Sequence, residues 1–163
     1  MSHRIFFKQG IATLLIWMTA VISVSAADIS PQMPSKEDKC PVCGMFVYKY
    51  PDWIAEIIFT DGTIYFFDGA KDLFKFYLDL KKYVPHKNID EIAAIYVTEY
   101  YHMKLIDAKA AFFVIGSDVY GPMGKELIPL ETEADVREFL QDHKGDRMVK
   151  FEHVKPFIIQ KLD

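Results

Sequence analysis

The strongest constraint on the fold of this chain is an order of sequence patterns, strand, strand, helix, strand, that occurs twice. In its first occurrence, residues 53–59 and 63–67 are short runs rich in β-branched and aromatic side chains. Asp61-Gly62 separates them and is a strong signal for a β-hairpin, so we expect the two runs to be antiparallel neighbours. Residues 70–83 carry apolar side chains at spacings of three and four, which is typical of an amphipathic helix, and residues 92–97 are expected to form the next strand.

The second occurrence follows the same order with different residues. Residues 110–115 are expected to form a strand, Gly121-Pro-Met-Gly124 a turn, and residues 127–130 a short strand at a sheet edge. Residues 132–140 begin with Thr-Glu-Ala-Asp, a candidate capping box, which predicts that they form a helix. Residues 148–154 are expected to form the last strand.

These patterns predict an α+β protein made of two tandem ββαβ units with small antiparallel or mixed sheets. The first unit would span residues 40–106 and the second residues 108–158. The two units share little residue identity, so we interpret them as a weak internal duplication. An alternative stays open, because any small α+β protein can be divided into such units.

Residues 1–26 have the composition of a secretory signal peptide. Arg4 and Lys8 give a positive start, residues 11–24 are almost wholly apolar, and small residues precede the expected cleavage point. The apolar run is shorter than the ~20 residues that cross a bilayer, so cleavage is favoured over a retained anchor. We therefore expect a protein exported to the periplasm, with a proline-containing linker at residues 27–39.

The expected mature protein is acidic. The whole chain has a formal net charge of −4, and loss of Arg4 and Lys8 with the signal would change it to −6. Nucleic acid is not expected as a partner, because binding it needs a basic surface that neutralises phosphates. No cysteine lies near the cleavage point, so a lipid anchor there is not expected. An uncleaved signal or a transporter partner would still bring the protein into contact with a membrane.

The two cysteines, Cys40 and Cys43, form a Cys-x-x-Cys pair with three potential uses: dithiol redox chemistry, half of a zinc site, or binding of a soft metal. A thioredoxin-like pair precedes a helix, whereas this pair is followed by Gly44, Met45 and then a strand pattern. A structural zinc site needs four Cys or His ligands, and the chain has no second close pair of them. A sulfur site for copper(I), which accepts two or three soft ligands, fits the pair better.

Two methionines are candidates to complete such a site. Met45 lies two residues beyond Cys43, and Gly44 gives the backbone freedom to turn the thioether toward the same ion. Met123 lies in the Gly-Pro-Met-Gly turn, so we expect it at a loop tip; a methionine that folds over the core is an equal alternative. His102 is a further candidate ligand, although a single histidine is more often a surface residue.

Two other functions remain open from the residues alone. Cys40 and Cys43 could serve a periplasmic thiol–disulfide oxidoreductase, or form a staple in an interaction module that binds no metal. The sequence contains no nucleophile elbow, phosphate loop or dinucleotide fingerprint. We therefore expect a binding protein and not an enzyme.

A set of segments in a fixed order carries a resemblance to a known family. The segments are Cys40-Pro-Val-Cys-Gly-Met45, Trp53, Ile58-Phe-Thr-Asp-Gly62, Phe66-Phe-Asp68, Ala94-Ile-Tyr-Val97, Ile106-Asp-Ala108 and Gly121-Pro-Met-Gly124. Together they resemble the NosL family, the copper-binding accessory proteins of nitrous oxide reductase, over nearly the whole mature chain. The cysteine segment taken alone also resembles the metal-binding modules of the YHS and TRASH type.

The NosL resemblance implies a tandem ββαβ fold and a periplasmic chaperone that carries copper(I) toward assembly of the copper–sulfide centre of the reductase. It implies copper ligands among Cys40, Cys43, Met45 and Met123. The partner would be a copper-accepting client such as nitrous oxide reductase or its assembly machinery. The chain departs from the family pattern twice: it lacks the lipidated cysteine of many relatives, and it has Gly69-Ala-Lys71 where relatives often carry another cysteine.

Overall fold

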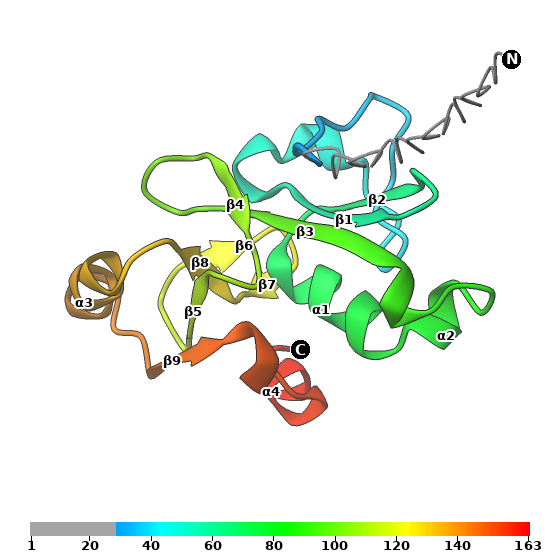
Figure 1. The fold of residues 1–163 in the computed structure, drawn as a ribbon. Coiled ribbons are helices and arrows are strands. Elements are labelled where there is room, and N and C mark those ends of the chain that lie inside the picture. Colours follow the sequence, from blue (N-terminus) through cyan, green and yellow to red (C-terminus); the bar gives the residue numbers. More distant parts are fainter. Residues whose placement is uncertain (1–28) are drawn as a thin grey trace, which may run out of the picture.

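The computed structural model of the protein describes residues 29–163, and the expected signal peptide lies outside these residues. The first part of the fold is a four-stranded antiparallel sheet in the order β2-β1-β3-β4 (Figure 1). Its strands are β1 (Ala55–Phe59), β2 (Ile64–Phe67), β3 (Ile92–Thr98) and β4 (Leu105–Asp107). The hairpin expected between β1 and β2 is present, with Gly62 at a φ of 84° in its turn. A side chain at this φ is strained, which explains the glycine.

The second part is a three-stranded antiparallel sheet in the order β8-β5-β9, with a separate two-stranded hairpin. The sheet is formed by β5 (Phe112–Ile115), β8 (Ile128–Leu130) and β9 (Arg147–Lys150), and the hairpin by β6 (Tyr120–Gly121) and β7 (Gly124–Lys125). In both sheets the first strand along the chain is central and pairs with the second on one side and the third on the other. The predicted α+β class with small antiparallel sheets is confirmed, whereas the internal duplication stays a prediction.

The helices differ from the sequence predictions at their ends. The helix expected over residues 70–83 is divided into α1 (Ala70–Leu78) and α2 (Leu80–Tyr83), because the backbone of Asp79 leaves the helical region. Helix α3 (Glu133–Asp142) begins with the predicted capping box, in which the Thr132 hydroxyl accepts a hydrogen bond from the Asp135 amide.

The last predicted strand is shorter than expected. The strand predicted over residues 148–154 ends at Lys150, the last residue of β9 (Arg147–Lys150). A single 3₁₀ turn (Phe151–His153) and helix α4 (Pro156–Leu162) follow it. Proline at the first position of α4 is favourable there, since that residue has no intrahelical hydrogen bond to donate. Three further 3₁₀ turns span Val47–Lys49, Pro51–Trp53 and Ile89–Glu91.

One hydrophobic core joins the two parts of the fold. Helix α1 lies between the two sheets (Figure 1), and its Phe74 ring contacts Phe113 of β5 and Phe151, at centroid distances of 5.1 and 4.9 Å. Side chains alternate along β5, so that Phe113 and Ile115 face this core and Val114 faces a smaller cluster under α3. Both faces of the second sheet are therefore covered.

The residues before the cysteine pair are attached to the first sheet. The Tyr96 hydroxyl donates to the Ile29 carbonyl, and the Gln32 amide donates to Glu56 Oε1 at 2.9 Å. Glu56 is buried on β1, and this burial raises its pKa to about 7. The expected linker thus contacts the body of the protein along part of its length.

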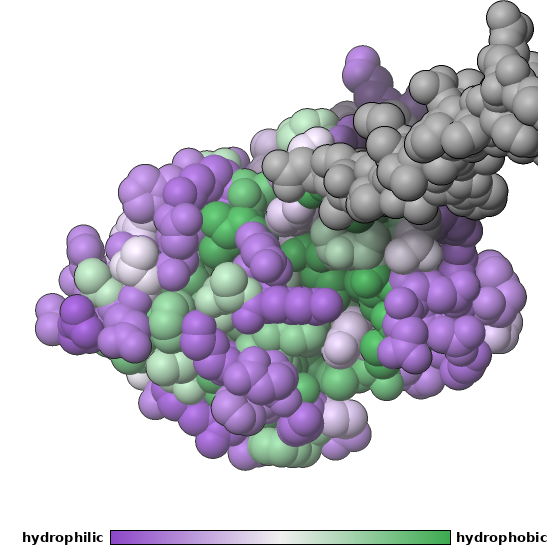
Figure 2. Space-filling view, viewed as in Figure 1, coloured by the Kyte–Doolittle hydropathy of each residue, from purple (hydrophilic) through white to green (hydrophobic). Residues whose placement is uncertain are grey.

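The surface in Figure 2 is hydrophilic over α2 and around α3, and its hydrophobic residues gather in the middle of the view, over β3 and α1. None of the helices within residues 29–163 has both the length and the apolar character that crossing a bilayer requires.

Candidate metal centre

The cysteine segment forms a closed loop. The Cys40 amide donates to the Met45 carbonyl and the Gly44 amide donates to the Cys40 carbonyl, both at 2.9 Å. Gly44 has a φ of 80°, so a glycine is favoured at this point of the loop. Lys39 and Phe46 pair on either side of the loop as an isolated β-bridge. The cysteines are therefore presented by a loop and not by the first turn of an α-helix, unlike a thioredoxin-like pair.

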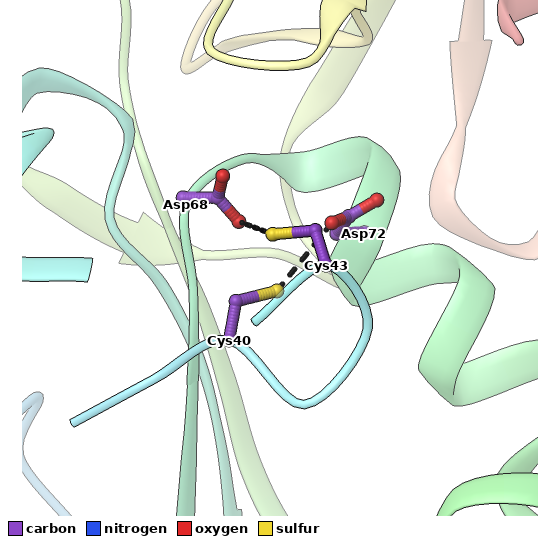
Figure 3. A group of neighbouring side chains, drawn as sticks. All are labelled: Cys40, Cys43, Asp68 and Asp72. Carbon is purple, nitrogen blue, oxygen red and sulfur yellow. Dashed lines mark hydrogen bonds between the residues drawn. The ribbon is translucent and has the colours of Figure 1, made fainter. Parts of the chain in front are cut away.

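Two aspartates lie beside the two thiols (Figure 3). Potential ligand atoms of Cys40, Cys43, Asp68 and Asp72 all lie within 4.8 Å of one another. Asp68 directly follows β2, and Asp72 is in the first turn of α1. The Cys43 thiol donates to Asp68 Oδ1 at 3.2 Å, and the Cys40 thiol donates to Asp72 Oδ2 at 3.4 Å. Each thiol thus has its own carboxylate.

Cys40, Asp68 and Asp72 are buried and Cys43 is half-buried, and this burial raises the pKa of both thiols. Burial is the main cause that raises the pKa of Cys43 to about 12, and the neighbouring charge of Asp68 raises it further. The pKa of Cys40, which is more deeply buried, is also raised, first by burial and then by Asp68 and Asp72. Both cysteines are free and not joined by a disulfide.

The second carboxylate oxygens lack hydrogen bonds. Among the residues that the structure describes, Asp68 Oδ2 and Asp72 Oδ1 are buried without a hydrogen-bond partner, although the Lys75 ammonium lies 3.7 Å from Asp72 Oδ1. Buried polar atoms are normally paired, so unpaired ones next to two thiols are what a metal-binding centre would leave in its metal-free form.

Met45 and Met123, the two predicted thioether ligands, lie on two different segments. The backbone of Met45 closes the cysteine loop, and its Sδ accepts a hydrogen bond from the Tyr50 hydroxyl at 3.4 Å. Met123 lies in the turn between β6 and β7, as the sequence predicted, with 43% of its surface exposed. The Lys71 ammonium donates to the Met123 carbonyl at 2.8 Å. Figure 3 shows the yellow β6–β7 hairpin next to the start of α1, which carries Asp72. Both methionines stay predicted ligands.

His102 lies in the exposed connection between β3 and β4. Its amide and its Nδ1 both contact Oε2 of the buried Glu99, at 2.6 and 2.9 Å. Within residues 29–163, it is not part of the group of potential metal ligands around the cysteines. His102 is therefore hydrogen-bonded to Glu99 and does not lie with Cys40 and Cys43.

Neither aspartate was among the metal ligands expected from the sequence. Asp68 lies before the N-cap Gly69 of α1 and Asp72 in the first turn of the helix, so helical spacing does not relate the two carboxylates. No local pattern in the sequence places them beside the cysteine loop.

The four side chains of the centre offer two kinds of metal ligand, thiols and carboxylates. The two thiols become soft thiolate ligands when a metal displaces their protons, and with a thioether they suit copper(I). A four-ligand zinc site was not expected, because the chain has no second close pair of Cys or His residues. The two carboxylates change this, since two thiolates and two carboxylates are also donors that zinc accepts.

Comparison with known proteins gives concordant results. The family model described as NosL matches residues 31–159. The copper-binding lipoprotein NosL of Stutzerimonas stutzeri is 27% identical over 130 residues, which cover 76% of this chain and 65% of the relative. The chain thus spans slightly less than two thirds of that relative.

Two solved structures are similar to this one. The crystal structure of the copper chaperone NosL from Shewanella denitrificans has a TM-score of 0.66 at 24% identity, covering 78% of this chain and 97% of that chain. The solution structure of apo-NosL from Achromobacter cycloclastes has a TM-score of 0.46 at 20% identity, covering 64% and 87%. The first of these matches shows that the fold is shared.

Proposed function

This chain belongs to the NosL family, and from this premise we propose that it is an exported copper(I)-binding chaperone rather than an enzyme. One observation carries the proposal: two free thiols, each with its own carboxylate, lie together in a closed loop that ends in a methionine. Thiolate and thioether ligands select copper(I) over harder ions. The printed names of the relatives, a copper-binding lipoprotein and a copper chaperone, support the same function.

The ligands we propose are the thiolates of Cys40 and Cys43 with the thioethers of Met45 and Met123. Asp68 and Asp72 accept hydrogen bonds from the thiols in the metal-free protein and hold both sulfur atoms in the loop. When copper(I) binds, it takes the place of the two protons. A site with a few separate sulfur ligands suits a chaperone, because a partner can replace them one at a time.

The proposed setting is the periplasm, where the protein would hand copper(I) to a client. Nitrous oxide reductase, or the machinery that assembles its copper centre, is the client that the family implies. The S. stutzeri relative is a lipoprotein, which is consistent with an exported protein held near a membrane. In this chain, a retained signal or a membrane-bound partner would supply that proximity.

The test is a copper(I) titration of the reduced mature protein against a coloured competing chelator. We expect one copper(I) per chain, with affinity strongly reduced in Cys43→Ser and moderately reduced in Met45→Leu. Met33→Leu is the matched control, because Met33 is exposed and precedes the cysteine loop. Unchanged affinity in both site variants would rule out the proposed site.

Two competing functions are tested with the same protein. If zinc(II) displaced copper(I) from the centre in reducing buffer, the four-donor group would be a zinc site instead. Reduction of insulin disulfides that disappears in Cys43→Ser, without copper(I) retention, would favour a thiol–disulfide oxidoreductase. Thiols found fully bridged in protein isolated without reductant, with no metal bound, would favour an interaction module.

A further inference from the structure

The hairpin that carries Met123 is attached to the start of α1 by two hydrogen bonds, and α1 supplies the donor of both. Lys71 of α1 takes part in both: its amide donates to Glu126 Oε1 at 2.5 Å, and its ammonium donates to the Met123 carbonyl at 2.8 Å. Glu126 therefore caps a free amide at the N-terminus of α1 from a distant part of the chain. The Lys71 ammonium donates the second bond, to the turn that precedes Glu126.

Two glycines allow this close approach. A Cβ atom on Gly69 would overlap Glu126 Oε2, and one on Gly121 would lie 3.1 Å from the same oxygen. The carboxyl group of Glu126 thus fills the space that side chains at both positions would need. Because Gly69 and Gly121 have no side chains, the hairpin and the start of α1 can pack closely around the Glu126 carboxyl group.

Lys71 is almost completely buried, at 1% exposure, although lysine is rarely found inside proteins. Besides the Met123 carbonyl, its ammonium donates to the Leu162 carbonyl of α4 at 3.2 Å and lies 3.7 Å from Asp163 Oδ1. Three acceptors from two separate segments therefore surround the one ammonium group. This gives the buried charge the partners that it requires.

The hairpin needs such an attachment to have a defined position. Its strands β6 and β7 have two residues each, and a hairpin of that size has little stability of its own. The residue after Lys71 is Asp72, which accepts the hydrogen bond of the Cys40 thiol. Lys71 thus connects the backbone of Met123 to the same helical turn that borders the thiols.

We propose that Lys71 is a positioning residue that holds the Met123 turn beside the cysteine pair, so that the Met123 thioether can reach a copper(I) ion bound there. The proposal rests on the copper(I) function proposed above. Lys71 does not touch the ion; it acts through the backbone of Met123. Without the ammonium the turn is released, and the site keeps its two thiolates and loses its distant sulfur ligand.

The test compares Lys71→Met, which keeps most of the buried aliphatic volume, with Met123→Leu and with the double variant. Changes to residues that orient metal ligands lower affinity by roughly 10–100-fold. We expect each single variant to weaken copper(I) binding within that range and the double variant to be no weaker than either one. Such a result is the signature of two residues that act through one ligand.

A spectroscopic readout separates positioning from general stability. X-ray absorption of the copper(I) form should show one sulfur neighbour fewer in Lys71→Met than in the wild type, and the same loss in Met123→Leu. Lys150→Met is the matched control, since the Lys150 ammonium also donates to a backbone carbonyl, that of Ala110, but from β9 of the second sheet. This control should keep the wild-type sulfur count.

Two further measurements keep the proposal falsifiable. If Lys71→Met does not fold, Gly69→Ala provides the second route, because its Cβ would displace the Glu126 carboxylate and the hairpin with it; the same loss of a sulfur neighbour is expected. Hydrogen exchange of the amides of residues 120–126 in the metal-free protein should be faster in Lys71→Met.

The outcomes distinguish the two proposals. If the wild-type protein binds no copper(I), the proposed function is wrong, whereas faster exchange would still support the attachment by Lys71. An unchanged sulfur count in Lys71→Met, or additive losses of affinity in the double variant, would overturn the positioning role while leaving copper binding in place.

Discussion

At the scale of single residues, the defining feature of the site is that its thiols are protonated when no metal is bound. The pKa of Cys43 is raised to about 12 and that of Cys40 is raised as well, mainly because Cys40 is buried and Cys43 is half-buried. Neither thiol therefore loses its proton near neutral pH. A metal that binds both thiolates must release two protons into solution.

This gives a prediction for the pH dependence of copper(I) binding. Between pH 6 and pH 8 both thiols of the free protein stay protonated, so the affinity should rise about 100-fold per pH unit if both thiolates bind and about tenfold if one does. Chelator competition at several pH values measures this slope. A slope of zero over the range would mean that neither cysteine is a ligand, and Cys43→Ser should reduce the slope by one proton.

The same residues show what the sequence could and could not predict. The spacing of Cys40 and Cys43 predicted a reactive or metal-binding pair, and the Gly-Pro-Met-Gly sequence predicted a turn with Met123 at its tip. Asp68 and Asp72 were missed, because their role depends on how the cysteine loop packs against α1. Lys71 looked like a departure from the family pattern, and its contacts with Met123 and Glu126 depend on tertiary structure alone.

At the scale of elements, the helices α1 and α3 begin in different ways. Helix α3 has a local capping box, in which Thr132 and Asp135 satisfy each other's amides. Helix α1 follows Gly69, which has no side chain to offer, and Glu126 supplies the acceptor instead. The first arrangement was predictable from four adjacent residues. The second joins residues that are 55 positions apart.

The capping box of α3 leads to a stability prediction. Thr132→Ala should lower the free energy of unfolding by about 1 kcal/mol, because the Asp135 amide loses its acceptor. Urea unfolding followed by circular dichroism measures this change. Glu138→Ala, on the exposed face of the same helix, is the control and should change stability by less than about 0.5 kcal/mol. Equal effects of the two substitutions would contradict the assigned role of Thr132.

At the scale of the whole molecule, the single core makes the two predicted units dependent on each other. Phe74 lies in α1 of the first unit, and it packs against Phe113 and Phe151 of the second. Sequence patterns placed the strands and helices of each unit well. They gave no information on whether the units have separate cores, because contacts between distant aromatic side chains leave no local pattern.

We predict that the protein unfolds in one cooperative transition. Phe74→Ala should lower the free energy of unfolding by about 3–5 kcal/mol, the usual range for removal of a buried phenylalanine ring. Fluorescence of Trp53, which belongs to the first unit and packs against the cluster under α3, and circular dichroism of the whole fold should give coincident urea curves. Two separate transitions, or destabilisation of the first unit alone in Phe74→Ala, would show that the units fold independently.

Ile29 and Gln32 are hydrogen-bonded to the first sheet. This attachment shortens the free linker, and so limits how far the folded protein can move from a membrane anchor at residues that precede it. A free linker ending at residue 39 would have about ten more residues than one ending at residue 29. Because an extended chain spans about 3.5 Å per residue, those residues would add roughly 35 Å of reach. In a membrane-anchored form, these contacts would therefore keep the proposed copper site closer to the bilayer than a free linker would.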